Sequence, residues 1–168
     1  INMVTDDSRL RQWILFQRTL FEKHPAKNPT YGTAHTVKDF DRKHVSDYYY
    51  THYIPNNMII SIVGNAKNVK ENIVKYFGSL KPRRLIKRAE VKERLQTKVK
   101  KFVEKKKTLN SYMVLGYKTV SRMHKDSYVL DVISAILGRG QSGWMFDEIR
   151  NKRGLAYQVG INDENESD

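Results

Sequence analysis

Hydrophobic residues recur at helical spacing in five stretches of the chain. In residues 8–23 they occupy the i, i+3, i+4 and i+7 positions that place side chains on one face of a helix. The other four stretches are residues 41–54, 68–78, 127–138 and 144–153. Asp41 and Asn68 begin two of these stretches and Asp126 precedes a third, where a short polar side chain can accept the first free backbone N–H groups. The pattern therefore predicts five amphipathic helices.

Turn residues predict where these helices begin and end. Thr36 with Asp39 three residues later is typical of a helix start. Gly138 is expected to end the fourth helix, and Gly78 and Gly154 to end the third and fifth as left-handed residues after the last turn. Residues 24–32 hold two prolines and a glycine and are expected to form a surface loop.

Three other stretches favour strands. Residues 58–63 form a continuous apolar run rich in β-branched residues, which is typical of a strand buried on both faces. Residues 97–107 mix valines with lysines and predict a strand with one solvated face, and residues 110–119 predict the next strand. Residues 81–96 have no periodicity and are expected to form a basic, exposed linker between two domains.

Length and composition predict a globular chain. A compact chain of 168 residues buries about 70% of its unfolded surface, and 39% of these residues are hydrophobic. No apolar run approaches the roughly 18 residues of a membrane span, so we expect no membrane partner. The absence of cysteine excludes disulfides and thiolate chemistry but leaves the compartment open, with a cytoplasmic location favoured over secretion.

The net charge of +13 is concentrated in one segment. Residues 81–107 hold 13 Lys or Arg against 3 Glu, a local net of +10, so the remaining chain carries only +3. A nucleic-acid interface would show affinity that falls steeply with salt, but this segment contains one aromatic residue, Phe102. We therefore expect a solvated basic segment and no nucleic-acid partner.

Two long motifs resemble one family. Residues 137–150, LGRGQSGWMFDEIR, followed by residues 152–157, KRGLAY, resemble the second-domain signature of the insulinase, pitrilysin and mitochondrial-processing-peptidase family of zinc peptidases. Arg139, Gly143 and Trp144 depart from the usual glycine, serine and arginine of that signature. The YGT, YIPNNM, VGN and KYFGSL motifs within residues 31–80 are similar, in this order, to the first domain of the family.

The resemblance implies a fold and a function. It implies an α+β chain made of two partial domains of the processing-peptidase-like metallohydrolase fold, each with helices packed on a mostly antiparallel sheet. Residues 1–80 would form the C-terminal part of the first domain, and residues 81–96 would be a basic linker. Residues 97–168 would form the N-terminal part of the second domain, which lacks the metal and lies on the substrate side. The implied parent is a zinc endopeptidase that binds extended peptides in a closed chamber, with the remainder of the polypeptide or a homologous subunit as partner. A non-catalytic homologue that acts as a partner or assembly subunit is the alternative.

Zinc is expected in the parent protein and not in this part of it. The family's metal motif, H-x-x-E-H, places two imidazoles on one helical face beside a Glu that activates water, and it is absent here. No two of the five histidines are three to five residues apart. The serines lack a nucleophile-elbow context, and the glycine-rich loop follows a helix and lacks the Lys-Ser/Thr ending of a phosphate-binding loop. We predict neither catalytic residues nor peptide cleavage for the fragment alone.

Arg150 and Tyr157 are the candidate substrate-binding residues. The resemblance implies that this pair contacts the substrate backbone near the scissile bond, and Gly138, Gly140 and Ser142 would belong to a substrate loop. An Arg presents a fork of donors to a carbonyl or an oxyanion, and a Tyr adds one O–H donor. From the residues alone, Arg150 is better explained as an exposed cation at the end of a helix, and Tyr157 as a half-buried ring.

Overall fold

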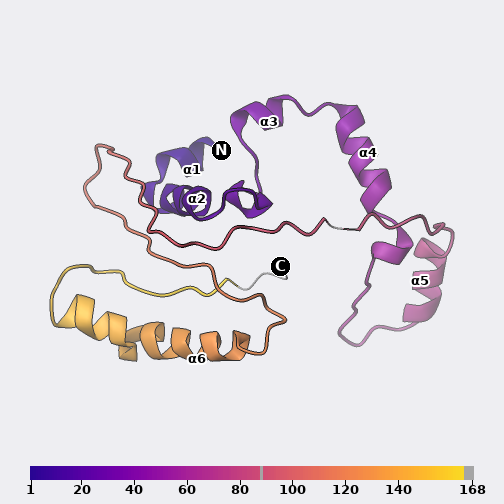
Figure 1. Ribbon diagram of the computed structural model, residues 1–168. Helices are drawn as coiled ribbons and strands as arrows, with labels where there is room; N and C mark the ends of the chain where they lie inside the picture. The colour runs from indigo at the N-terminus through magenta and orange to yellow at the C-terminus, as the bar shows by residue number, and fades with distance from the viewer. Residues whose placement is uncertain (88, 165–168) are drawn as a thin grey trace.

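A computed structural model describes residues 1–87 and 89–164 of the chain, and in those residues short helices are joined by turns, bends and irregular segments. Its elements are α1 (Asn2–Asp6), α2 (Ser8–Leu20), η1 (Pro25–Lys27), α3 (Ala34–Lys38), α4 (Arg42–His52), η2 (Pro55–Asn57), α5 (Val69–Phe77), α6 (Ser127–Gly138), η3 (Gly140–Ser142) and the π-helix η4 (Phe146–Asn151). Figure 1 shows α4 and α5 at one end of the molecule, whereas α1, α2 and α6 lie toward the other end. None of the described helices is both long and apolar enough to cross a membrane.

The predicted helices form, with some different ends. Asp41 caps α4 by accepting the His44 N–H at 2.8 Å, and Gly138 is the last residue of α6, as expected. The helix-start prediction at Thr36 was wrong by three residues. Thr33 is the N-cap of α3, where its hydroxyl accepts the Thr36 N–H, and the Thr36 hydroxyl accepts the Thr33 N–H in return. Asn68 and Asp126 precede α5 and α6 without a side-chain cap, and Gly78 has a right-handed backbone. Gly154 is left-handed, with a φ of +59°, as predicted.

The predicted α+β class was wrong, because the described residues contain no strand. Residues 58–63, 97–107 and 110–119 lie in segments that are neither helix nor strand, and their backbone groups form no ladder with one another. β-branched residues favour an extended backbone, whereas a strand also needs a neighbour about 4.8 Å away with its N–H and C=O groups in register. Ile59 and Val63, expected inside a sheet, are each 96% exposed.

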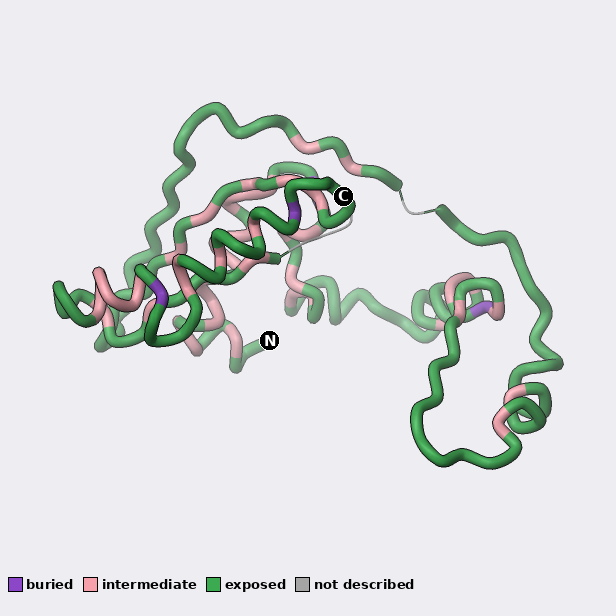
Figure 2. Tube along the Cα trace, turned by 90° about the horizontal axis from the view of Figure 1, so that it is seen from below, coloured by how far each residue is buried: buried purple, intermediate pink, exposed green. Residues whose placement is uncertain are grey.

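The described chain is open and has little core. Its accessible surface is 15,179 Å². A compact protein of 19.7 kDa would expose about 8,600 Å². Ile54, 3% exposed, is the buried hydrophobic residue among those described, and Figure 2 shows how rare buried positions are along the trace. The expectation of a compact core was therefore wrong.

Residues 93–118 run beside α1 and α2 and are held there by polar contacts. Arg11 on α2 donates two hydrogen bonds of 2.6 Å to the Glu104 carboxylate, and Lys106 donates to the carbonyls of Thr5 and Asp6. Glu93 accepts the backbone N–H groups of residues 22–24, which follow α2. The segment also packs closely, since a Cβ at Gly116 would lie 2.5 Å from the ring of Phe16.

Candidate functional site

The candidate site is built by the π-helix η4 and the turn that follows it. The Lys152 N–H donates to the Asp147 carbonyl at 2.9 Å, five residues back, which is the wide bonding pattern of a π-helix. Beyond it, the N–H groups of Gly154 and Leu155 donate to the carbonyls of Arg150 and Ile149. Each bond spans one residue more than in the usual glycine-terminated α-helix. The left-handed Gly154 thus turns the chain so that Tyr157 returns toward η4.

This turn brings together the two substrate-binding residues predicted from the sequence. The Arg150 guanidinium carbon lies 4.1 Å from the centre of the Tyr157 ring. The same carbon lies 4.7 Å from the centre of the Phe146 ring, one turn earlier on η4. Tyr157 is 76% exposed, so the group is open to a ligand. Both distances are typical of a cation held against aromatic faces.

The carboxylates near Arg150 are occupied by other cations. Lys152 Nζ lies 2.6 Å from a Glu148 carboxylate oxygen and 2.9 Å from an Asp147 oxygen, and Arg153 adds a 3.5 Å contact to Glu148. The hydrogen bonds from Lys152 lower the pKa of both carboxyls, and Glu148 in turn raises the pKa of Lys152. Among the described residues no acceptor takes a side-chain hydrogen bond from Arg150. Its five N–H donors are therefore available to a ligand.

The predicted substrate loop precedes η4. Gly138 packs against Ile161, since an added Cβ would lie 2.0 Å from Ile161 Cγ2. Gly140 is left-handed, with a φ of +54°, and has open space around it. The Ser142 hydroxyl donates to the Arg139 carbonyl at 3.1 Å, so it closes the loop locally. A Cβ at Gly143 would lie 2.8 Å from the Leu137 carbonyl oxygen, so this position leaves little room for a side chain.

The described residues do not fit a zinc ion. They contain no group of three or more His, Asp or Glu side chains that could share one metal. His35 and His44 each contact a neighbouring aspartate at 2.7 Å, and His52 stacks on Tyr48. These three histidine side chains thus make local contacts within α3 and α4.

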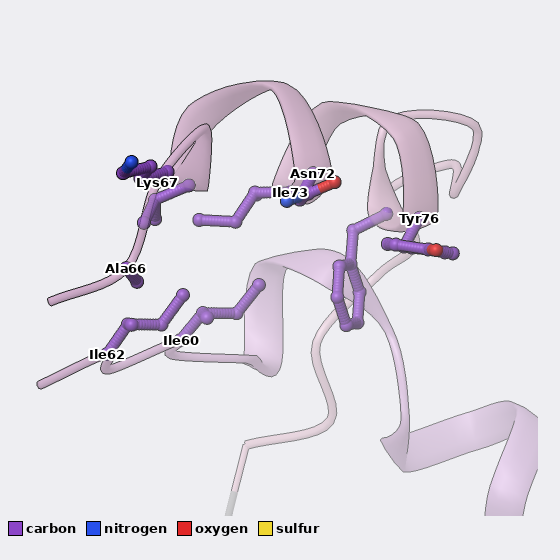
Figure 3. Close-up of a pocket in the computed structure, with 9 residues that line it drawn as sticks. Ile60, Ile62, Ala66, Lys67, Asn72, Ile73 and Tyr76 are labelled. Atoms are coloured by element: carbon purple, nitrogen blue, oxygen red, sulfur yellow. The ribbon is translucent and has the colours of Figure 1, made fainter. Parts of the chain in front are cut away.

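A small apolar hollow lies elsewhere, between α5 and the extended residues 60–62. Figure 3 shows Ile60 and Ile62 beneath Ile73, with Tyr76 at one side. The hollow has a volume of about 240 Å³ and is lined mainly by aliphatic and aromatic side chains. It lacks the convergent charged groups that would orient a reactive ligand.

Sequence reasoning missed Phe146 as part of the site. The four-residue spacing between Phe146 and Arg150 places them on one helical face, so the signal was available. It was attributed to the apolar stripe of the helix. The position of Tyr157 over the same guanidinium depended on the turn at Gly154 and on the π-helical register.

Comparisons with known proteins agree on one family. Residues 39–168, more than three quarters of the chain, match the family model described as the Peptidase M16 inactive domain. The chain is 31% identical over 161 residues to zinc protease PqqE of Helicobacter pylori, covering 92% of this chain and 36% of that protein. It is 28% identical over 146 residues to zinc protease YmxG of Bacillus subtilis, covering 86% of this chain and 35% of that protein.

The backbone of one solved structure is similar to that of this chain. The crystal structure of a protease from Helicobacter pylori superimposes with a TM-score of 0.79 at 23% identity, covering 98% of this chain and 41% of that one. This likeness shows a shared fold. The chain spans about a third of the length of the curated relatives it matches.

Proposed function

Because this chain belongs to the M16 peptidase family, we propose that it supplies the substrate side of a zinc endopeptidase, with Arg150 and Tyr157 contacting the bound peptide. The observation that carries the proposal is the Arg150–Tyr157 pair, in which the guanidinium of the half-buried Arg150 lies 4.1 Å from the ring centre of the exposed Tyr157. Among the described residues no carboxylate competes for this guanidinium.

The pair suits a peptide backbone. The planar guanidinium can donate two parallel hydrogen bonds to carbonyl oxygens or to an oxyanion, and the Tyr157 hydroxyl can donate a third. Since the contact with the ring uses no hydrogen bond and no described acceptor takes one from the Arg150 side chain, its N–H groups stay available for these bonds. The peptide would bind in extended form inside a closed chamber, where exclusion of water strengthens such contacts. No step of hydrolysis is assigned to the described residues, since they do not fit a zinc ion.

The proposed partner is the remainder of the same polypeptide or a homologous subunit. Helix α6 exposes Val129, Val132 and Ile136 on one face, and α4 exposes a row of tyrosines. Apolar faces of this extent are costly in water and are typical of surfaces that another part of a protein covers. The two relatives are also about two and a half times as long as this chain.

A non-catalytic homologue with a partner or assembly role is the second candidate. It is favoured by the loop before η4, where Arg139 and Trp144 depart from the family signature and Trp144 is exposed. In such a protein the fold and the peptide-contacting pair would persist without hydrolysis.

The complete reading frame decides between these functions. An H-x-x-E-H motif upstream of Ile1 supports the peptidase, and its absence from the complete protein refutes it. For the complete protein, we expect zinc binding and cleavage of an internally quenched peptide. Arg150→Ala should lower kcat/KM by 10- to 100-fold, since it removes charge-assisted hydrogen bonds worth about 1.5–3 kcal/mol.

The matched control is Arg153→Ala. Arg153 lies on the same turn, is exposed and contacts Glu148. This variant should retain activity within about 2-fold, since an exposed ion pair contributes little. An equal loss in both variants would contradict a role of Arg150 in peptide binding.

A further inference from the structure

Phe146 has a specific relation to Arg150 that goes beyond packing. The two residues are four apart on η4, and the guanidinium carbon lies 4.7 Å from the Phe146 ring centre. Tyr157 approaches the same guanidinium from the chain beyond the Gly154 turn. Two rings from different segments therefore contact one cation.

Aromatic rings and carboxylates hold an arginine in different ways. A carboxylate takes up the N–H edge of the guanidinium through paired hydrogen bonds, which removes those donors from any ligand. An aromatic ring attracts the cation to the face of the ring without accepting a paired hydrogen bond, so the N–H edge of the guanidinium can stay free. Asp147 and Glu148, the nearest carboxylates in sequence, are instead held by Lys152 and Arg153.

Free arginine side chains lose rotamer freedom when they bind. Arg carries about 2 kcal/mol of rotamer entropy, part of which is lost each time a flexible side chain is fixed on a ligand. A side chain already held in place loses less. On η4 the four-residue spacing places Phe146 beside Arg150, and the contact between them can hold the guanidinium before a ligand binds.

We infer that Phe146 is a positioning residue, which holds the Arg150 guanidinium against Tyr157 in the free protein and leaves its N–H edge directed to a peptide. The identity of the ligand, a peptide, rests on the proposed function. The contact between Phe146 and Arg150 does not. Phe146 acts through Arg150 and forms no hydrogen bond with the peptide. The benefit is an arginine ordered before binding occurs.

The first test needs no peptide. In the labelled chain, ring currents should move the Arg150 side-chain N–H and Hδ resonances upfield of those of Arg9, an exposed arginine without a ring contact. Phe146→Leu should return the Arg150 resonances most of the way to the Arg9 values, while Phe146→Tyr should keep them. Unmoved Arg150 resonances in Phe146→Leu overturn the inference. Phe102→Leu, at an exposed phenylalanine, is the matched control and should change nothing at Arg150.

The second test measures peptide binding by the complete protein. Phe146→Leu should raise KM about 2- to 5-fold with little change in kcat, the factor that one exposed cation–π contact supplies. Phe146→Tyr should restore the KM, which a purely volumetric role would not require. A KM unaffected by Phe146→Leu in a protein that responds to Arg150→Ala overturns the positioning role. If Arg150→Ala has no effect, the proposed function fails, and the resonances still decide whether Phe146 holds Arg150.

Should Phe146→Leu unfold η4, Tyr157→Leu provides the same measurement from outside the helix. It removes the second ring and should shift the Arg150 resonances by a comparable amount, since the two distances are 4.7 and 4.1 Å. Retention of the full upfield shift in both single variants overturns the two-ring arrangement.

Discussion

Replacing Glu93 with glutamine should loosen the contact between the basic segment and the end of α2. The Glu93 carboxylate accepts the backbone N–H groups of Glu22, Lys23 and His24, three consecutive residues. Lys118 Nζ lies 3.1 Å from the same carboxylate. Consecutive N–H groups of this kind form a concave anion site, and here a side chain of the same molecule occupies it. The Glu93 side chain is only 11% exposed.

The lowered pKa of Glu93 gives the size of the stabilisation that this carboxylate provides. Burial by itself raises this pKa, but the backbone N–H groups of His24 and Lys23, the Lys118 ammonium and the Glu22 N–H outweigh it and lower the pKa from 4.5 to about 2. At 1.36 kcal/mol per pKa unit this difference corresponds to about 3 kcal/mol. Screening near the surface reduces it to about 2 kcal/mol. Because the folded-state pKa is the lower one, this stabilisation is complete above pH 4.5 and is lost as the pH falls toward 2.

Amide hydrogen exchange measures this contact directly. At pH 6, Glu93→Gln should accelerate exchange of the Glu22, Lys23 and His24 amides by about 30-fold, the factor that corresponds to about 2 kcal/mol of local opening. Glu90→Gln is the matched control, since Glu90 is exposed on the same segment. It should leave these amides unchanged. A change of less than about 3-fold in Glu93→Gln, or equal changes in both variants, would refute the assignment of a charge-assisted anion site.

Three further predictions concern close packing, backbone conformation and charge. Gly138→Ala should lower the free energy of unfolding by about 1–3 kcal/mol, because its Cβ would overlap Ile161, whereas Gly160→Ala, with open space around it, should be nearly neutral in the same denaturant titration. Gly154→Ala should cost about 1–2 kcal/mol, because its φ is +59°, and should separate Tyr157 from Arg150, which loss of the Arg150 ring-current shift would reveal; a retained shift contradicts this. Fluorescence anisotropy should detect no binding of duplex DNA at 0.15 M salt, and an affinity that falls steeply as salt is raised would instead identify residues 81–107 as a nucleic-acid interface.

The helices follow from local physics. An apolar stripe at 3.6-residue spacing, an acceptor at the N-cap and a glycine that tolerates a left-handed backbone all act within a few residues of one another. Asp41 and Gly154 were therefore assigned correctly from the sequence. The family resemblance was also carried by contiguous motifs, and the match to residues 39–168 confirms it.

The strands and the contacts between distant segments depend on tertiary structure. A run such as residues 58–63 favours an extended backbone, but the sequence does not say whether a second segment lies beside it to complete a ladder. Glu93 and residues 22–24 are about 70 positions apart, and their contact depends on how the basic segment passes α2.

The candidate site shows most clearly which features the sequence determined and which the tertiary structure determined. The sequence alone determined that an arginine ends a helix, that a glycine turn follows it and that a tyrosine lies seven residues later. The spacing of Phe146 and Arg150 could also be read from the sequence, but only the tertiary structure decided that Tyr157 lies against the same guanidinium, since this depends on the direction of the chain after Gly154. The physical reason is that spacing specifies which side chains share a face, whereas contact distance is set by backbone register and by what occupies the neighbouring carboxylates.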